Sequence, residues 1–198
     1  VMAKKRITLG FDTSNYTTSA AIFDVENGEI VKNLKLPLPV AEGQRGLRQS
    51  DALFAHIKNL PEICELLRGE YDYESVCAIG YSAYPRDNEG SYMPCFLAGK
   101  TAATSFAAAA GVPLYAFSHQ NGHIMAAAYA SGQMEKLMQG QFIAFHVSGG
   151  TTEAVLAKGT GRGFDLKLVA KTLDLNAGQA VDRVGLMLGL RFPCGMEL

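Results

Sequence analysis

The same order of predicted elements occurs twice in this chain of 198 residues. Runs of apolar residues predict three strands followed by a helix, first from near Ile7 and again from near Phe142. A small, hydroxyl-rich turn follows the first strand of each copy, at residues 13–16 and at residues 148–152. An internal repeat of this kind predicts an α/β protein built from two related halves.

The two copies differ in length beyond their shared opening. The first continues through strand, helix, strand and helix, which predicts β-β-β-α-β-α-β-α over residues 1–140. The second, residues 141–198, stops soon after its first helix and is interpreted as the apparently truncated start of another half. We therefore expect an incomplete cleft, a 198-residue chain that is inactive alone, and an open sheet edge that favours a homodimer.

Apolar spacing also predicts how two helices are buried. Ser50 and Asp51 are expected to cap a helix whose buried stripe comprises Leu53, Phe54, Ile57 and Leu60. Within it, Pro61 either kinks the helix or opens a second one. A later helix is expected to run towards Met138, with an apolar face made of Ile124, Ala127, Ala128 and Met134.

Charge and composition exclude several classes of function. A net charge of −1 and a pI near 6.5 provide no general footprint for nucleic acid, so any such contact is local or shared with partners. No apolar run approaches the roughly 20 residues that span a bilayer, so no membrane contact is expected. The four cysteines form no CxxC pair and follow no signal sequence, which indicates reduced thiols in the cytoplasm.

Two of the four histidines, His119 and His123, lie four residues apart. In a helix they share one face, about one turn apart, and both imidazoles can reach a single ion. They follow a predicted strand and open a helix, which is the usual place for a site in an α/β domain. The alternative is two polar side chains at a helix start, because the spacing alone supplies no third ligand.

The turn beginning at Ser148 is a candidate phosphate site. Its Ser148-Gly149-Gly150-Thr151 sequence can present backbone N–H groups as an anion nest, and its glycines allow a ligand to approach closely. An ordinary glycine hairpin turn is the alternative. For Asp182, in the middle of a predicted helix, the alternative to a binding role is a solvated carboxylate.

Four segments, in order along the chain, resemble the tRNA threonylcarbamoyladenosine transferase family, long labelled O-sialoglycoprotein endopeptidase or glycoprotease and grouped with the M22 peptidases. The resemblance implies the RNase H-like, actin-like ATPase fold of the sugar kinase and actin superfamily. The segments are Gly10-Phe11-Asp12-Thr13-Ser14, Ser118-His119-Gln120-Asn121-Gly122-His123, His146-Val147-Ser148-Gly149-Gly150-Thr151-Thr152, and Ala177-Gly178-Gln179-Ala180-Val181-Asp182-Arg183 with residues 188–195.

The resemblance also implies an activity and a set of ligands. Family members move threonylcarbamoyl from threonylcarbamoyl-AMP to N6 of adenosine 37 in tRNA. His119 and His123 would hold a divalent metal, iron or zinc. The implied partners are tRNA, a paralogous actin-like subunit and an ATPase subunit in a multi-protein complex. An adenine nucleotide or the adenylate would be held by His146, Val147, Ser148, Gly149, Gly150, Asp182 and Gly195.

The chain departs from the family pattern in ways that leave alternatives open. Tyr16 and Thr17 stand where bacterial members carry an acidic residue, Gln179 replaces a glutamate, and Cys194 replaces a glycine. The family's third metal ligand is an aspartate near the far C-terminus, and the 198 residues end before that position. The chain is therefore interpreted as the N-terminal portion of a transferase or diverged paralogue, or as a non-catalytic paralogous partner subunit. A metallopeptidase and an actin-like small-molecule kinase are weaker alternatives, the first because no glutamate separates the histidines.

Overall fold

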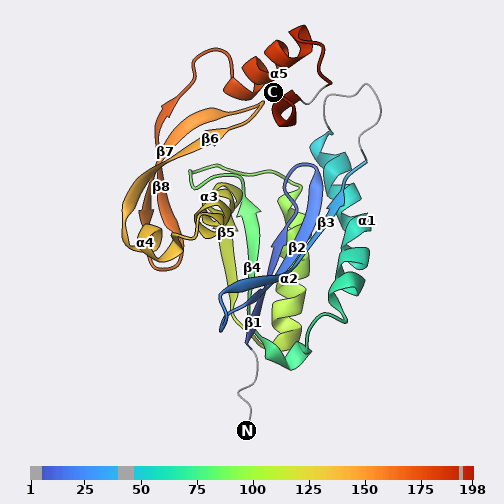
Figure 1. The fold of residues 1–198 in the computed structure, drawn as a ribbon. Helices are drawn as coiled ribbons and strands as arrows, with labels where there is room; N and C mark the ends of the chain where they lie inside the picture. The colour runs from blue at the N-terminus through green and yellow to red at the C-terminus, as the bar shows by residue number, and fades with distance from the viewer. Residues whose placement is uncertain (1–5, 40–46, 192–193) are drawn as a thin grey trace. The chain divides into compact units, whose positions relative to one another are not determined.

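The structure, a computed structural model, describes residues 6–39, 47–191 and 194–198 (Figure 1). The chain divides into two compact units, Val1–Gly122 and His123–Leu198, which we call unit 1 and unit 2. The boundary after residue 140 that the sequence predicts separates the two copies of the repeat, whereas the boundary after Gly122 separates two packed units. The repeat boundary stays a prediction. None of the helices in the described part of the chain is long and apolar enough to cross a membrane.

Unit 1 contains a five-stranded sheet with the order β3-β2-β1-β4-β5. The first three strands form an antiparallel meander, and β4 and β5 extend the sheet in parallel with β1. The β2–β3 hairpin turns at Gly28, whose φ of 69° suits glycine, as the Asn27-Gly28 pair predicts. The strands are β1 (Ile7–Asp12), β2 (Thr17–Asp24), β3 (Glu29–Pro37), β4 (Val76–Tyr84) and β5 (Leu114–Ser118).

Two long helices pack against this sheet, α1 (Gln49–Leu67) and α2 (Phe96–Ala110), and a short 3-10 helix, η1 (Tyr73–Ser75), precedes β4. The helices contact each other, and α2 packs on β1 and β4 while α1 packs on β2 and β3. The alternation of buried and half-buried residues along β1 and β2 directs one side of each strand into this core. The most deeply buried members of the core are Leu9, Ile22, Ile63, Leu67, Ile79 and Ala103.

The predicted stripe of α1 is wrong at two of its four residues. Phe54 and Ile57 are 65% and 52% exposed, Leu53 and Leu60 are half-buried, and Ala52 and His56 face the core. Ser50 and Asp51 lie inside the helix, which begins after Arg48 without a side-chain cap. The helix continues through Pro61 as one element, so neither a new helix nor an interruption occurs there. Residues 40–46, which precede α1 in the sequence, lie outside the described residues.

Unit 2 is built on an antiparallel sheet with the order β6-β7-β8. Its elements are β6 (Gln141–Val147), β7 (Thr152–Gly159), β8 (Phe164–Lys171), α4 (Met134–Gln139), α5 (Ala177–Met187) and the 3-10 helix η2 (Cys194–Met196). A small core forms around Ala128, Ala157 and Phe164. Gly159 lets β7 approach α4, because a Cβ there would lie 1.9 Å from the Met138 carbonyl oxygen.

Helix α3 (His119–Ala130) begins in unit 1 and continues into unit 2. The predicted helix extending to Met138 is wrong, because the chain turns after α3 at Gly132, with φ 68°, and α4 is a separate helix. Ala128 is buried as expected, whereas Ala127 is exposed. The β-β-β-α order is nevertheless confirmed in both copies, as is the continuation of the first through β4, α2, β5 and α3.

Candidate metal and nucleotide sites

The two candidate metal ligands lie on α3, which begins directly where β5 ends. Ser118 fixes this junction: its Oγ accepts a hydrogen bond from the Asn121 N–H at 3.0 Å and donates one to Asp87 Oδ2 at 2.6 Å. His119 and His123 are both helical, so their spacing places them on one face, one turn apart. Their expected position at the carboxyl end of a parallel strand is confirmed.

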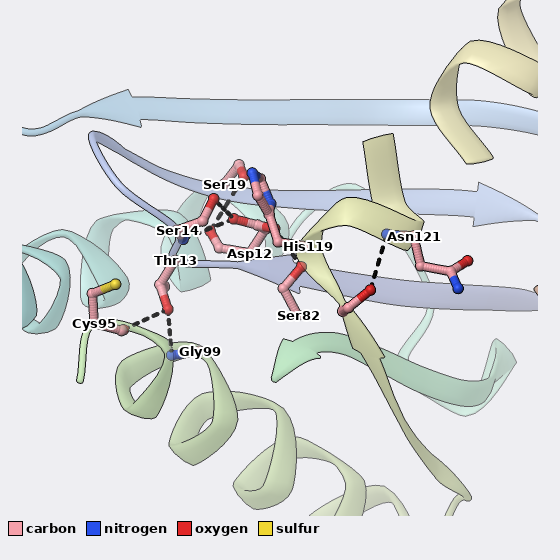
Figure 2. A network of polar contacts seen from close by, with 10 residues as sticks. Asp12, Thr13, Ser14, Ser19, Ser82, Cys95, Gly99, His119 and Asn121 are labelled. Atoms are coloured by element: carbon pink, nitrogen blue, oxygen red, sulfur yellow. Dashed lines mark hydrogen bonds and ion pairs between the residues drawn. The ribbon is translucent and has the colours of Figure 1, made fainter. Parts of the chain in front are cut away.

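Asp12, at the end of β1, contacts the first of these histidines. His119 Nδ1 lies 2.8 Å from Asp12 Oδ2, and the Ser82 hydroxyl donates to the same oxygen. The other oxygen, Oδ1, accepts from the Ser14 backbone N–H at 2.8 Å and from the Ser14 hydroxyl. Figure 2 shows this cluster gathered around the carboxylate from β1, β4 and α3.

The surroundings of Asp12 favour its ionised form. Burial alone would raise the pKa of the carboxyl, but the hydrogen bond and charge of His119, then the hydroxyls of Ser14 and Ser82, outweigh it. The net effect holds the pKa of Asp12 well below its usual range. Asp12 is therefore a pure hydrogen-bond acceptor at neutral pH.

The hydroxyls of the first turn are committed to protein contacts. Thr13 Oγ1 is completely buried, donates to the Cys95 carbonyl at 2.9 Å and accepts from the Gly99 N–H at 3.0 Å. It thereby fastens the start of α2 to the end of β1 (Figure 2). Because Ser14 is bonded to Asp12, both hydroxyls of this turn stabilise the fold.

In unit 2, a second imidazole lies near His123. The rings of His123 and His146 are 5.6 Å apart between centroids, and His146 Nδ1 lies 3.3 Å from Glu153 Oε1. Glu153 is only 4% exposed, while His146 is half-buried near the end of β6. Val147, the last residue of β6, is 54% exposed.

The candidate phosphate turn is a compact structure organised by one hydroxyl. Ser148 Oγ accepts hydrogen bonds from the N–H groups of Gly150 and Thr151, at 3.3 and 3.0 Å. The Ser148 N–H donates to the Thr151 carbonyl at 2.7 Å and closes the turn. Gly149 and Gly150 remain exposed, so their backbone is accessible from solvent.

Helix α5 begins directly against this turn. The Gly178 N–H donates to the Ser148 carbonyl at 3.2 Å, and the Ala177 N–H donates to Thr152 Oγ1 at 2.8 Å. A Cβ on Gly178 would lie 2.4 Å from the Ser148 carbonyl carbon and 2.5 Å from the Gly149 nitrogen. Only glycine therefore fits at this contact, which joins a helix N-terminus to a glycine turn.

The remaining predicted binding residues, Asp182 and Gly195, lie on α5 and η2. Asp182 Oδ1 accepts a hydrogen bond from the Cys194 N–H at 2.9 Å, so its carboxylate holds η2 beside α5. Cys194 is buried against Gly185, and Gly195 follows it in η2. Asp182 is thus tied to the backbone rather than simply solvated. Two residues of the fourth motif, Phe192 and Pro193, lie outside the described residues.

The structure assembles the predicted residues only in part. Across the described ranges, no three or more histidine, cysteine, aspartate or glutamate side chains form a group that could hold a metal ion.

Sequence reasoning assigned no role to Asp12, Ser82 or Gly178. Asp12 carried a signal nonetheless, because an acidic residue closing a buried strand before a hydroxyl-rich turn points to a functional end of the sheet.

Unit 1 has the strand order β3-β2-β1-β4-β5 with mixed strand directions, and unit 2 begins with a second β-β-β-α. This arrangement is that of an RNase H-like, actin-like α/β protein. Among solved structures, YeaZ from Pseudomonas aeruginosa is similar with a TM-score of 0.49 and 14% identity, over 87% of this chain and 68% of that one. The model of the family described as TsaD, tRNA N6-adenosine threonylcarbamoyltransferase, matches residues 42–198. The chain belongs to this family.

Individual family members are similar along the whole chain. The tRNA N6-adenosine threonylcarbamoyltransferase of Streptococcus suis (strain 05ZYH33) is 32% identical over 198 residues, covering 98% of this chain and 54% of that protein. The protein of the same description from Lacticaseibacillus casei (strain BL23) is 29% identical over 201 residues, covering 100% of this chain and 54% of that protein. The chain therefore spans about half the length of the relatives it matches.

Proposed function

We propose that the protein carrying this chain transfers threonylcarbamoyl from threonylcarbamoyl-AMP to N6 of adenosine 37 in tRNA. The observation that carries the proposal is the placement of His119 and His123 on one face of α3, at the carboxyl end of β5, in a chain of this family. A metallopeptidase is disfavoured, because Gln120, Asn121 and Gly122 supply no general base between the histidines.

The adenylate would lie on the turn after β6. The exposed turn at Gly149 and Gly150 and the positive N-terminal end of α5 would favour a phosphate, with the Gly149 N–H as donor, because the N–H groups of Gly150, Ala177 and Gly178 already bond within the protein. Ser148 keeps the turn preformed through its two hydrogen bonds. His146 and Val147 would border the nucleotide, and Asp182 would shape the far side by holding η2 and Gly195 in place.

The two histidines of α3 would hold a divalent metal ion, iron or zinc. The donor set fits, because imidazole nitrogens one helical turn apart can share an ion and Asp12 occupies the other ring nitrogen of His119. When bound, such a metal supplies Lewis-acid polarisation of the acyl carbonyl. The turn from Ser148 to Thr151 would stabilise the departing AMP as the adenosine amine attacks.

The activity requires partners. The charge of −1 provides no general footprint for tRNA, so we place the protein in a cytoplasmic complex in which other subunits share tRNA binding. A paralogous actin-like subunit and an ATPase subunit are the expected members of that complex.

The test is a transfer assay with the full-length protein, its partner subunits, threonylcarbamoyl-AMP and tRNA that lacks the modification. We expect N6-threonylcarbamoyladenosine in the digested tRNA by mass spectrometry. The His119→Ala and His123→Ala variants should lose most of this product while still folding. Absence of product with the complete wild-type complex would contradict the proposal.

A non-catalytic partner subunit is the second candidate, and the tip of the first turn favours it. Tyr16 is 46% exposed where bacterial members carry an acidic residue, so a carboxylate is replaced by a phenol at that point. A partner subunit should support a separate transferase equally well with or without His119 and His123. Equal stimulation by wild-type protein and the double alanine variant would therefore select this candidate.

A further inference from the structure

We propose that Asp12 is a positioning residue for the metal centre: its carboxylate accepts the Nδ1–H of His119, which directs the Nε2 atom of that ring to the ion. This inference rests on the proposed function of His119 as a metal ligand. It assigns a role to a carboxylate that lies on a different element, 107 residues earlier in the chain.

The hydrogen bonds around Asp12 determine the tautomer of His119. An ionised carboxylate can only accept hydrogen bonds, so the 2.8 Å contact between His119 Nδ1 and Asp12 Oδ2 requires the proton to be on Nδ1. The hydroxyls of Ser14 and Ser82 and the Ser14 N–H also donate to this carboxylate. Each of these donors reinforces the ionised state that fixes the tautomer.

The His119 ring is restrained in orientation as well as in tautomer. Phe96 meets it edge to face, with ring centroids 6.2 Å apart and planes at 65°. The backbone of His119 is fixed by the capped start of α3. A histidine whose second nitrogen donates to a carboxylate is the common arrangement of metal-bound imidazoles, because the carboxylate fixes the ring and raises its basicity.

Replacement of Asp12 by asparagine distinguishes two roles for this side chain: setting the tautomer of His119, and merely connecting β1 to α3 through a hydrogen bond. The Ser14 N–H and hydroxyl both donate to the position of Oδ1, so the side-chain oxygen of asparagine must remain there. Its NH2 group then takes the position of Oδ2, opposite His119 Nδ1. An NH2 group donates, so Nδ1 must become the acceptor and the ring proton must move to Nε2.

The experiment measures the tautomer directly in the full-length protein, free of metal and labelled with ¹⁵N in its histidines. Two-dimensional ¹H–¹⁵N spectra of the imidazoles at mildly alkaline pH should show His119 protonated on Nδ1 in the wild type and on Nε2 in Asp12→Asn. The Ser82→Ala variant is the matched control, since it removes one donor and keeps the carboxylate, and its tautomer should stay as in the wild type. An Asp12→Asn spectrum with the proton still on Nδ1 overturns the inference.

Zinc binding supplies the second readout. Competition with a chromophoric chelator should show an affinity about 10- to 100-fold lower in Asp12→Asn, as for other carboxylates that support a metal-bound histidine, and close to wild type in Ser82→Ala. An unchanged affinity in Asp12→Asn overturns the positioning role alone. Wild-type protein that binds no zinc or iron overturns the metal role in the proposed function, and with it this inference, whatever the spectra of the variants.

Discussion

Asp12 of unit 1 and His146 of unit 2 occupy the same place in the two copies of the repeat. Asp12 pairs with Ser19 of β2, and His146 pairs with Glu153 of β7, so each lies opposite the residue seven positions later. In unit 1 the carboxylate is on the first strand and the imidazole comes from α3. In unit 2 the imidazole is on the first strand and the carboxylate is on the next.

The position shared by Asp12 and His146 has a different role in each unit. Asp12 and His119 have side chains that are about one quarter exposed, and Asp12 collects donors from three elements. Glu153 has a side chain that is only 3% exposed and contacts the neighbouring residue on its own sheet. The pair in unit 1 is thus arranged to orient a side chain from a helix, whereas the pair in unit 2 is anchored within the sheet.

The helix contacts next to these positions differ in a similar way. In unit 1, Thr18 Oγ1 lies 2.8 Å from Nδ1 of the fully buried His56 on α1. In unit 2, Thr152 Oγ1 accepts the backbone N–H of Ala177 at the start of α5. The contact in unit 1 therefore joins two side chains, whereas in unit 2 the helix backbone meets a side chain at Ala177 and the turn backbone at Gly178.

The largest expected effect comes from that backbone approach. Gly178→Ala should lower the stability of unit 2 by about 1 to 3 kcal/mol, because its Cβ would overlap the Ser148 and Gly149 backbone, which cannot move like a side-chain end. Gly99→Ala in unit 1 should cost less, since its nearest neighbour is the Thr13 side chain at 2.9 Å. Hydrogen exchange of the amides in each unit measures both effects.

Gly122→Ala is the control for this pair of variants. Its Cβ would meet no atom within 4 Å, so alanine should be neutral or stabilise α3 by up to about 1 kcal/mol. Equal destabilisation by Gly178→Ala and Gly99→Ala would remove the distinction drawn between the two units.

A smaller effect is expected from the hydroxyl that shapes the second turn. Ser148→Ala removes the acceptor of two backbone N–H groups and should weaken AMP binding about 5- to 10-fold, equivalent to roughly 1 kcal/mol. Isothermal titration calorimetry with AMP measures the change. Thr160→Ala is the control, since Thr160 Oγ1 also bonds to the backbone of its own turn, accepting the Arg162 N–H and donating to the Gly163 carbonyl, outside the proposed site. Equal losses in both variants would show that turn rigidity in general, rather than this turn, governs binding.

The smallest expected effect is on the pH dependence of stability and comes from His56. The corresponding contact in unit 2, between Thr152 and the Ala177 N–H, contains no titratable side chain. Burial lowers the pKa of His56 below its ordinary value of 6.5, although an Asn15 backbone contact and the Asp12 charge oppose the shift. The unfolded chain therefore takes up a proton at His56 first, so stability is full above pH 6.5 and falls as the pH drops below it.

Chemical unfolding at a series of pH values measures this dependence. The loss of stability just below pH 6.5 should be smaller in His56→Gln than in the wild type. Asp12 does not obscure the measurement, because its pKa lies below the ordinary value of 3.8 and its contribution is lost only at lower pH. Identical pH profiles for the two proteins would contradict the role given to the buried imidazole.

The sequence predicted the order of elements well, because strand alternation and turn residues are local signals. The β-β-β-α openings of both copies, the Asn27-Gly28 hairpin and the start of α3 at His119 are confirmed. The buried face of α1 was not predictable in this way. A stripe containing Phe54 and Ile57 is more apolar than the one containing Ala52 and His56, yet the structure buries the latter, since Thr18 and the sheet contact that side.

The candidate site was predictable only where its residues share one local segment. The helical pair His119 and His123 is predicted by spacing, but the contact between Asp12 and His119 depends on two strands that are distant in sequence. The need for glycine at position 178 likewise arises only from the approach of α5 to the turn after β6. Such contacts are tertiary, and no local period encodes them.

Zinc binding by the full-length protein tests the central claim that both histidines of α3 serve one ion. Chelator competition should compare the wild type with His119→Ala, His123→Ala and the double variant. We expect one tightly bound equivalent in the wild type, a large loss of affinity in each single variant, and little further loss in the double variant. Unchanged binding in either single variant would contradict the claim, because that histidine would then lie outside the site.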